Sequence, residues 1–388
     1  MKRIAVLFAD GFEESESLTI VDILRRAQMD SVIVGVTGKE VMGVHDINVR
    51  ADIELKDVKA EDFDMVVVPG GYVGVDALMY SPETIEFIRD MDSLGKFVTA
   101  ICAGPRVLEA ADVLGERNYT CYPGQEAKII SGKHQQALVI RDGNLITAIG
   151  PAICYAFAYA LVDALGGDSL AVKNRMVYFN AFDEASSHLD PCPEKVDRPK
   201  EEKKVAILMK EGFEEGETFT IVDIMRRLDV ECTTFCFSED LWVKGMHGIM
   251  IEADESFSDA IEEYDVVVLP GGRPGGANLA ADPQVIDLLK RWNEIPGKLL
   301  TALCSGTTVL AAAEVIEGKH MTGYTGYAAK LPGAIFEETL AVADQNLVTS
   351  QGPATGYPFA FKLAETLGYD TRIVRSRLMY DFAGGKNA

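Results

Sequence analysis

Two cysteines in this sequence stand between small residues directly after a short apolar run. Cys102 is the centre of Ala-Ile-Cys-Ala-Gly, and Cys304 is the centre of Ala-Leu-Cys-Ser-Gly. A buried strand that turns sharply into a helix leaves no room for large side chains, so small residues two positions before and after a reactive side chain are typical of a nucleophile elbow. The N-terminus of the following helix favours a thiolate. The spacing therefore predicts two nucleophilic cysteines.

A carboxylic acid is the expected proton partner of each thiol. Glu16 and Glu217 both follow a Gly-Phe-Glu-Glu sequence and lie in the first turn of a predicted helix. A carboxyl group buried beside a thiolate has a raised pKa, stays protonated and donates a hydrogen bond to the sulfur. The preceding Glu13 and Glu14 are interpreted as serving the helix N-terminus. We therefore expect Glu16 and Glu217 to carry protons for the two thiols.

Each predicted site also has backbone groups that could hold an anion. Pro-Gly-Gly follows a predicted buried strand in both halves, and glycine lets main-chain amides approach a ligand closely. We expect the amides of Gly71 and Ala103 to form an oxyanion hole, and those of Gly272 and Ser305 to form another. The alternative is a tight turn without a ligand. Residues 271–276 match neither a dinucleotide motif nor a P-loop, and no cysteine spacing completes a zinc site, so no cofactor and no metal are expected.

The histidines are few. Of the five, only His45 and His247 occupy corresponding positions in the two halves. They are auxiliary candidates for the site, and a strand-end or interface role is the alternative. No His-x-Glu sequence is present, which argues against a glutamine amidotransferase with its Cys-His-Glu triad.

The chain carries an internal repeat. The motifs around the glutamates, the Pro-Gly-Gly sequences and the cysteines recur at an offset of 201 or 202 residues. A period of this length indicates a duplicated domain. We predict a first domain over residues 1–182, a polar linker over 183–203 that contains prolines, and a second domain over 204–388.

The pattern of elements predicts the fold class. Apolar runs at 4–8, 64–68, 97–101 and 205–209 are typical of buried strands, and helical spacing covers 14–28 and 153–165. Alternating strands and helices predict α/β domains with mostly parallel sheets. Ligands of such sheets bind beyond the carboxyl ends of the strands, which is where the glutamates, glycines and cysteines fall.

Composition excludes several classes of protein. The formal net charge is −23, so binding to nucleic acid or to an anionic membrane is not expected. No apolar run approaches the roughly 18–20 residues of a membrane span, and acidic residues follow the first apolar run where a signal peptide would have its cleavage site. Seven cysteines at these spacings indicate reduced thiols. We expect a cytoplasmic protein.

Taken together, Gly-Phe-Glu-Glu-x-Glu, Val-Val-Pro-Gly-Gly and Ile-Cys-Ala-Gly-Pro resemble the ThiJ/PfpI superfamily, and within it the DJ-one-like deglycase branch. The resemblance implies two tandem flavodoxin-like domains, an easily oxidised cysteine and a protonated glutamate touching it. It also implies cofactor-free conversion of methylglyoxal-type aldehydes, repair of glycated residues, redox sensing or a chaperone role in stress. Related single-domain proteins form dimers, so we expect the two domains to pair within one molecule.

The sequence departs from that branch at one position in each half. Tyr122 and Tyr324 stand where many members have a histidine, and a phenol with a pKa near 10 moves protons poorly at neutral pH. The peptidase branch has a histidine directly after the cysteine, where this chain has Ala103 and Ser305, so proteolysis is disfavoured. Two hypotheses follow: a glutathione-independent glyoxalase or deglycase, and a non-catalytic redox sensor or stress chaperone. Hydrolysis of an amide or isonitrile is a third.

Overall fold

The computed structural model describes residues 1–180, 199 and 201–383. The chain forms two compact units. Among the described residues, the first unit consists of Met1–Lys173, Asn180 and residues 375–383, and the second consists of Asn174–Phe179 and residues 199 and 201–374. Most of the predicted linker lies outside the described residues, and the domain boundaries proposed above stay a prediction.

The first unit is built on a seven-stranded sheet with the order β10-β11-β7-β6-β1-β2-β5. Only the edge strand β10 runs antiparallel to its neighbour. The strands are β1 (Arg3–Phe8), β2 (Asp30–Gly35), β5 (Ile53–Glu54), β6 (Met65–Val68), β7 (Phe97–Ile101), β10 (Val139–Asp142) and β11 (Leu145–Ala148). Two short pairs lie outside this sheet: β3 (Glu40–Met42) with β4 (Asn48–Arg50), and β8 (Asn118–Tyr119) with β9 (Lys133–His134).

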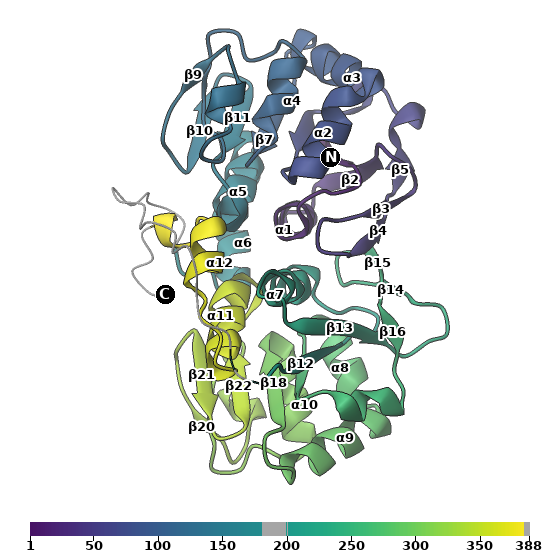
Figure 1. The fold of residues 1–388 in the computed structure, drawn as a ribbon, viewed down its shortest axis with the longest axis vertical. Coiled ribbons are helices and arrows are strands. Elements are labelled where there is room, and N and C mark those ends of the chain that lie inside the picture. Colours follow the sequence, from purple (N-terminus) through teal and green to yellow (C-terminus); the bar gives the residue numbers. More distant parts are fainter. Residues whose placement is uncertain (181–198, 200, 384–388) are drawn as a thin grey trace. The chain divides into compact units, whose positions relative to one another are not determined.

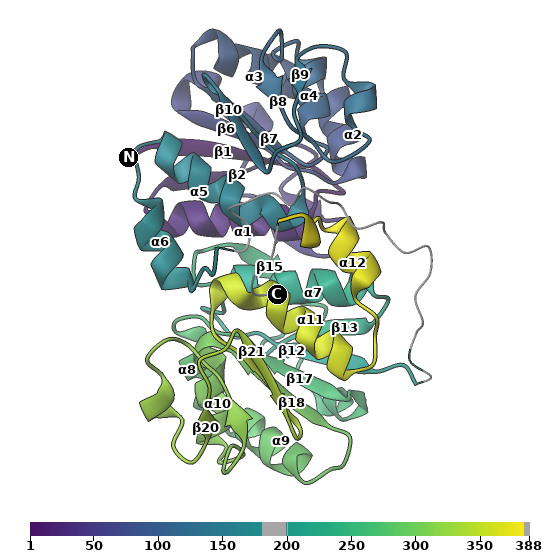
Figure 2. The ribbon, with the colours of Figure 1, turned by 90° about the vertical axis from the view of Figure 1, so that its left-hand side faces the viewer.

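Helices cover both faces of this sheet. Figure 2 shows α3 and α4 on one face and α1 and α5 on the other. The helices of the first unit are α1 (Glu14–Arg26), α2 (Tyr72–Tyr80), α3 (Pro82–Ser93), α4 (Pro105–Ala110), α5 (Cys154–Ala164) and α6 (Ser169–Met176), the last of which ends in residues grouped with the second unit. The central strands β1 and β6 are buried almost throughout, as expected for parallel strands enclosed on both faces.

The second unit repeats this plan with the strand order β16-β13-β12-β17-β18-β22-β21 (Figure 1). Its strands are β12 (Lys204–Leu208), β13 (Glu231–Cys236), β16 (Glu255–Ser256), β17 (Val266–Leu269), β18 (Leu299–Leu303), β21 (Ala341–Asp344) and β22 (Leu347–Ser350), with the pairs β14 (Trp242–Lys244)–β15 (Met250–Glu252) and β19 (His320–Met321)–β20 (Ile335–Phe336) outside. Its helices are α7 (Glu215–Arg227), α8 (Gly275–Ala280), α9 (Pro283–Asn293), α10 (Thr307–Ala312), α11 (Gly356–Thr366) and α12 (Arg372–Arg377), the last of which continues into the first unit. Trp292, fully buried, packs in the core between this sheet and α9.

The register of the central strands brings the candidate site together. Val68 on β6 pairs with Ala100 on β7, so the two strands end side by side. Pro-Gly-Gly follows β6, Cys102 follows β7, and the loop after β1 leads into α1. Parallel strands place their carboxyl ends at one edge of the sheet, and the same register is present between β17 and β18 in the second unit.

The predicted fold class, two tandem flavodoxin-like α/β domains, is confirmed. Predicted strand and helix ranges differ from the observed ones by one or two residues at some ends, for example residues 14–28 against Glu14–Arg26. Within the described part of the chain, none of the helices is both long enough and apolar enough to cross a bilayer.

Candidate functional site

Each elbow cysteine has a left-handed backbone conformation, which residues other than glycine rarely adopt. Cys102 has φ of 60° and Cys304 has φ of 53°. The left-handed region costs a residue other than glycine about 1–2 kcal/mol, and such residues concentrate at functional sites. The amide of Cys102 donates to the carbonyl of Ala148 at 3.0 Å, which holds the turn against the neighbouring strand β11. The sharp turn predicted from the flanking small residues is therefore present in both units.

Glu16 lies against Cys102. A hydrogen bond joins the Glu16 carboxyl to the Cys102 sulfur. Glu16 Oε2 also accepts a hydrogen bond from the amide of Gly70 at 2.8 Å. A β-carbon on Gly70 would lie 2.6 Å from Glu16 Oε2 and 3.0 Å from Cys102 Sγ. The first glycine of Pro-Gly-Gly is thus required by the pair, because any side chain there would push the acid and the thiol apart.

The second unit repeats this arrangement. The amide of Gly271 donates to Glu217 Oε2 at 2.9 Å, and a hydrogen bond joins Glu217 to Cys304. A β-carbon on Gly271 would lie 2.8 Å from Glu217 Oε2 and 3.0 Å from Cys304 Sγ. Both predicted acid–thiol pairs are therefore brought together by the structure.

Glu16 and Cys102 are two ionisable acids that are both largely shielded from solvent. Glu16 is fully buried and Cys102 is 8% exposed. Burial raises the pKa of the Cys102 thiol well above its ordinary value, and the negative charge of Glu16 raises it further, whereas a hydrogen bond from the amide of Ala103 lowers it. Two anions this close repel each other, so Cys102 ionises readily only while Glu16 holds its proton. With that proton on Glu16, the sulfur is a thiolate that accepts a hydrogen bond.

Two of the four backbone amides expected to hold an anion contact the thiols. The amide of Ala103 donates to Cys102, and the amide of Ser305 donates to Cys304. Gly71 and Gly272 have φ of 94° and 105°, conformations that favour glycine. A β-carbon at either position would lie 2.2 Å from a backbone oxygen of the loop before α1 or α7. Their role as an oxyanion hole stays a prediction.

The two corresponding histidines bind a different glutamate. Nδ1 of His45 lies 2.8 Å from Glu14 Oε2, and Nδ1 of His247 lies 3.1 Å from Glu215 Oε2. The backbone amide of each histidine donates to the same carboxylate. Glu14, interpreted from the sequence as a helix N-terminal residue, and its counterpart Glu215 therefore each hold the turn that carries the histidine. These contacts favour the structural alternative for His45 and His247.

The tyrosines in place of the family histidine are engaged by main-chain acceptors. Tyr122 donates its hydroxyl to the carbonyl of Arg377 at 3.0 Å, and its amide donates to the carbonyl of Cys102 at 2.8 Å. Tyr324 donates its hydroxyl to the carbonyl of Arg175 at 2.8 Å. Arg377 belongs to the first unit and Arg175 to the second. Tyr122 thus lies next to the elbow, and its hydroxyl proton is directed to a backbone oxygen.

Sequence reasoning missed the residue that follows the second glycine. In the first unit it is Tyr72, whose pKa is raised by burial and by the charge of the Cys102 thiolate and lowered by Arg106. In the second unit it is Arg273, whose pKa is raised by a hydrogen bond with Tyr327 and by nearby anions that include Cys304. The two sites therefore differ in charge. The signal was present in the sequence: Tyr72 and Arg273 stand at corresponding positions after Gly-Gly in the two halves.

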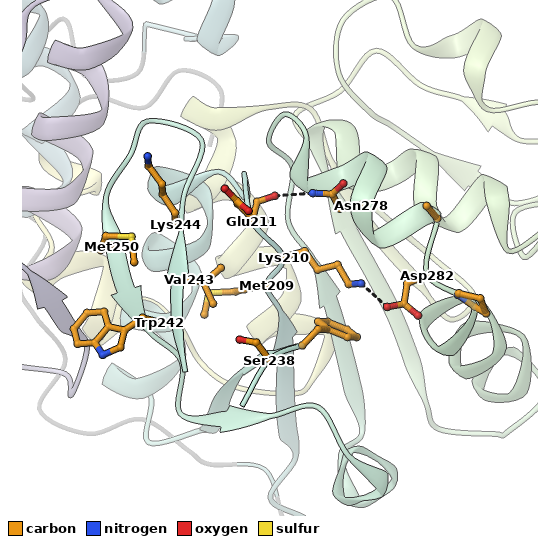
Figure 3. Close-up of a pocket in the computed structure, with 13 residues that line it drawn as sticks. Met209, Lys210, Glu211, Ser238, Trp242, Val243, Lys244, Met250, Asn278 and Asp282 are labelled. Atoms are coloured by element: carbon orange, nitrogen blue, oxygen red, sulfur yellow. Dashed lines mark hydrogen bonds and ion pairs between the residues drawn. The ribbon is translucent and has the colours of Figure 1, made fainter. Parts of the chain in front are cut away.

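The second unit has an open pocket that is not the thiol site (Figure 3). Its lining residues include neither Cys304 nor Glu217. Lys210 forms an ion pair with Asp282 there, and its Nζ lies 4.3 Å from the centre of the Phe237 ring. At the corresponding positions the first half has Ala9, Ser81 and Val36, so this pocket's charged pair is particular to the second half.

Comparisons with known proteins identify relatives of this chain. Protein DJ-1 homolog B of Arabidopsis thaliana is 27% identical over 380 residues, which cover 94% of this chain and 84% of that protein. Glutathione-independent glyoxalase DJR-1.2 of Caenorhabditis elegans is 32% identical over 157 residues, 40% of this chain and 83% of that protein. A deglycase of Pyrococcus abyssi is 30% identical over 165 residues, 42% of this chain and 99% of that protein.

Among solved structures, Drosophila melanogaster DJ-1beta is 34% identical, covers 45% of this chain and 97% of its own, and has a TM-score of 0.43. The model of the DJ-1/PfpI family matches residues 2–164 and again 203–366, one match in each half. This chain is a tandem member of the DJ-1/PfpI family.

Proposed function

We propose that this protein is a glutathione-independent, cofactor-free glyoxalase or deglycase that acts on methylglyoxal-type α-oxoaldehydes through a nucleophilic cysteine. The observation that carries the proposal is the buried Glu16–Cys102 pair at a strained elbow, repeated as Glu217–Cys304. Relatives named as a glyoxalase and as a deglycase support it.

The reaction needs no external oxidant or reductant. The Cys102 thiolate adds to the aldehyde carbon of methylglyoxal, and the carbon–sulfur bond that forms gives a hemithioacetal. Loss of the proton on that carbon and delivery of a proton to the neighbouring carbon oxidise the first and reduce the second, which yields a lactate thioester. Water then cleaves the carbon–sulfur bond, and lactate and the free thiol are released.

Glu16 is the group placed to move protons in these steps. It holds the shared proton when Cys102 is a thiolate, donates it to the alkoxide formed by the addition, and as a carboxylate accepts the proton from carbon. The amides of Gly71 and Ala103 stabilise the oxyanion in the same steps. Burial of the pair strengthens each of these interactions because water is excluded.

Lactate formation from methylglyoxal, measured without glutathione or added metal, tests the proposal. Wild type is compared with Cys102→Ala, Cys304→Ala and the double variant. Loss of at least about 10²-fold in the double variant is expected, since the nucleophile of both sites is gone. Undiminished turnover in the double variant contradicts the proposal, and the two single variants assign the turnover to each unit.

A second candidate function is a redox-sensing or stress-chaperone role without catalysis, in which the same cysteine is oxidised. The hydroxyl of Tyr122, which stands in place of the branch histidine, is directed to a backbone carbonyl, and this favours a site with poor proton transfer. Dilute peroxide followed by peptide mass spectrometry separates the two roles. A sensor gains oxygen at Cys102 faster than at the other cysteines and makes no lactate.

A further inference from the structure

A cluster of three potential metal ligands lies in the first unit, outside the acid–thiol pair. Cys121 Sγ, a carboxylate oxygen of Glu126 and a ring nitrogen of His134 all lie within 4.8 Å of one another. Cys121 follows β8, Glu126 begins the short 3₁₀ helix Glu126–Lys128, and His134 ends β9. Parallel pairing of β8 with β9 places Tyr119 opposite His134, which brings the imidazole to the end of β8 where Cys121 lies. The three residues therefore converge from three separate elements.

The cluster has an unsatisfied polar atom. Oε2 of Glu126 is buried and has no hydrogen-bond partner in the part of the chain that the structure describes, and the same is true of Oε1 of the neighbouring Gln125. A buried acceptor without a partner is costly, and each such atom in a native protein calls for an explanation. A bound cation would satisfy the Glu126 oxygen.

The burial of the three residues suits entry of an ion from one side. Cys121 is fully buried, Glu126 is partly buried, and His134 is exposed. The His134 ring contacts the Tyr119 ring at a tilt of 58°, with 5.5 Å between their centroids, which limits the directions that the imidazole can take. The thiol closes the inner side of the cluster, and the outer side is open to solvent for a fourth ligand.

The second unit shows that the local fold does not need these side chains. The corresponding residues are Gly323, Ala328 and Phe336, none of which binds metals through its side chain. The same elements form there nevertheless: a 3₁₀ helix spans Ala328–Lys330, and Met321 pairs with Phe336 as Tyr119 pairs with His134. All three ligand types are present together in one unit and absent together in the other. This pattern is expected of a set of ligands, whose members serve their purpose only together.

We propose that Cys121, Glu126 and His134 form a zinc site that is separate from the Cys102 site. One thiolate, one carboxylate and one imidazole are donors that Zn²⁺ takes in tetrahedral geometry, with water as the fourth ligand where the protein supplies three. On binding, the Cys121 thiol releases its proton to solvent and the sulfur bonds the ion. The site adjoins the elbow, because Tyr122, the residue after Cys121, donates its amide to the carbonyl of Cys102.

Cobalt replaces zinc as a visible probe in the test. The full-length Cys102→Ser/Cys304→Ser protein, freed of metal, is titrated with Co²⁺, so that the elbow thiols cannot bind the ion. We expect one equivalent to bind with a thiolate-to-cobalt charge-transfer band and to be displaced by Zn²⁺. In the same background Cys121→Ser loses the band, and Glu126→Gln and His134→Ala each weaken binding by at least about tenfold.

The controls separate loss of a ligand from loss of the fold. His320→Ala removes a histidine that pairs with Glu337 in the second unit and leaves cobalt affinity unchanged. Glu126→Gln keeps the size of the side chain, so its metal-free unfolding temperature stays close to that of the background protein while its affinity falls. The proposal is wrong if the background protein shows no charge-transfer band, or if the band persists at the same affinity in Cys121→Ser.

Discussion

Glu16 and Cys102 meet over the α-carbon of Gly70, 54 residues from the acid in sequence and 32 from the thiol. The Gly70 amide fixes one carboxyl oxygen of Glu16, and the Cys102 sulfur shares a hydrogen bond with the same side chain. The acid is therefore oriented by the backbone before any substrate arrives. The relationship is repeated by Glu217, Gly271 and Cys304.

Glu16→Gln is expected to separate nucleophilicity from proton transfer. The amide of glutamine still donates a hydrogen bond to the Cys102 thiolate but neither gives up nor accepts a proton. Alkylation of Cys102 by iodoacetamide should therefore continue, while lactate formation at this site falls by about 10²-fold or more. The measurement is made in a Cys304→Ala background, so that only the first site reports. Equal loss of alkylation and turnover would show that Glu16 serves only to position the thiol.

Gly70→Ala is expected to disrupt the first site alone. Its β-carbon would lie 2.6 Å from Glu16 Oε2 and 2.7 Å from Cys102 Cβ, so the acid and the thiol must move apart. A displacement of this kind costs on the order of 10²-fold in turnover and about 1–3 kcal/mol in the free energy of unfolding. Peptide-resolved alkylation rates check it, with Gly271→Ala as the matched control that slows Cys304 and spares Cys102. Unchanged alkylation of Cys102 in Gly70→Ala contradicts the geometry.

Arg273 is expected to make the second site favour anionic reagents. Its guanidinium hydrogen-bonds Tyr327 and interacts electrostatically with Cys304, whereas the first site has Tyr72 at this position. The ratio of the iodoacetate rate to the iodoacetamide rate should be higher at Cys304 than at Cys102. Arg273→Met should lower this ratio about fivefold, since two unit charges about 4 Å apart in water interact with roughly 1 kcal/mol. Using the ratio removes any effect of the substitution on the thiol pKa, and a ratio that stays constant would exclude this role.

Stability at high pH should depend on Cys232. Burial raises the pKa of this thiol to about 12, the charge of Asp254 adds to the rise, and the charge of Arg226 opposes it. Above pH about 8.5 the unfolded chain releases the thiol proton and the folded chain keeps it, so the free energy of unfolding falls as pH rises toward 12. Urea unfolding at pH 8 and pH 10 measures this. The decrease should be about 2 kcal/mol larger in wild type than in Cys232→Ala, and equal decreases would refute the linkage.

The sequence was sufficient for the parts of the site that lie at the ends of buried strands. Cys102, Glu16 and Gly71 follow apolar runs whose pairing in a parallel sheet is strongly constrained, and each recurs in the second half. Pairing of β6 with β7 then brings them together without further information.

Contacts between distant loops were not predictable in this way. The bond from Tyr122 to the carbonyl of Arg377 joins residues 255 apart, and no local pattern indicates it. The role of Glu14 in holding the turn of His45 depends on how a loop folds back over the start of α1. Likewise, Cys121, Glu126 and His134 form no recognisable ligand spacing, because a short parallel pairing between β8 and β9 assembles them.

Trapping of the covalent intermediate tests most directly the claim that Cys102 is the nucleophile and Glu16 its proton carrier. Glu16→Gln/Cys304→Ala protein, in which only the first site can react, is mixed with methylglyoxal and examined intact by native mass spectrometry, because a hemithioacetal reverts to the free thiol on digestion. We expect the hemithioacetal to accumulate, so that this protein gains one methylglyoxal unit, while Cys304→Ala protein with Glu16 intact turns the adduct over and carries much less. A mass gain that is the same in Cys102→Ala/Cys304→Ala protein would contradict the assignment of Cys102 as the nucleophile.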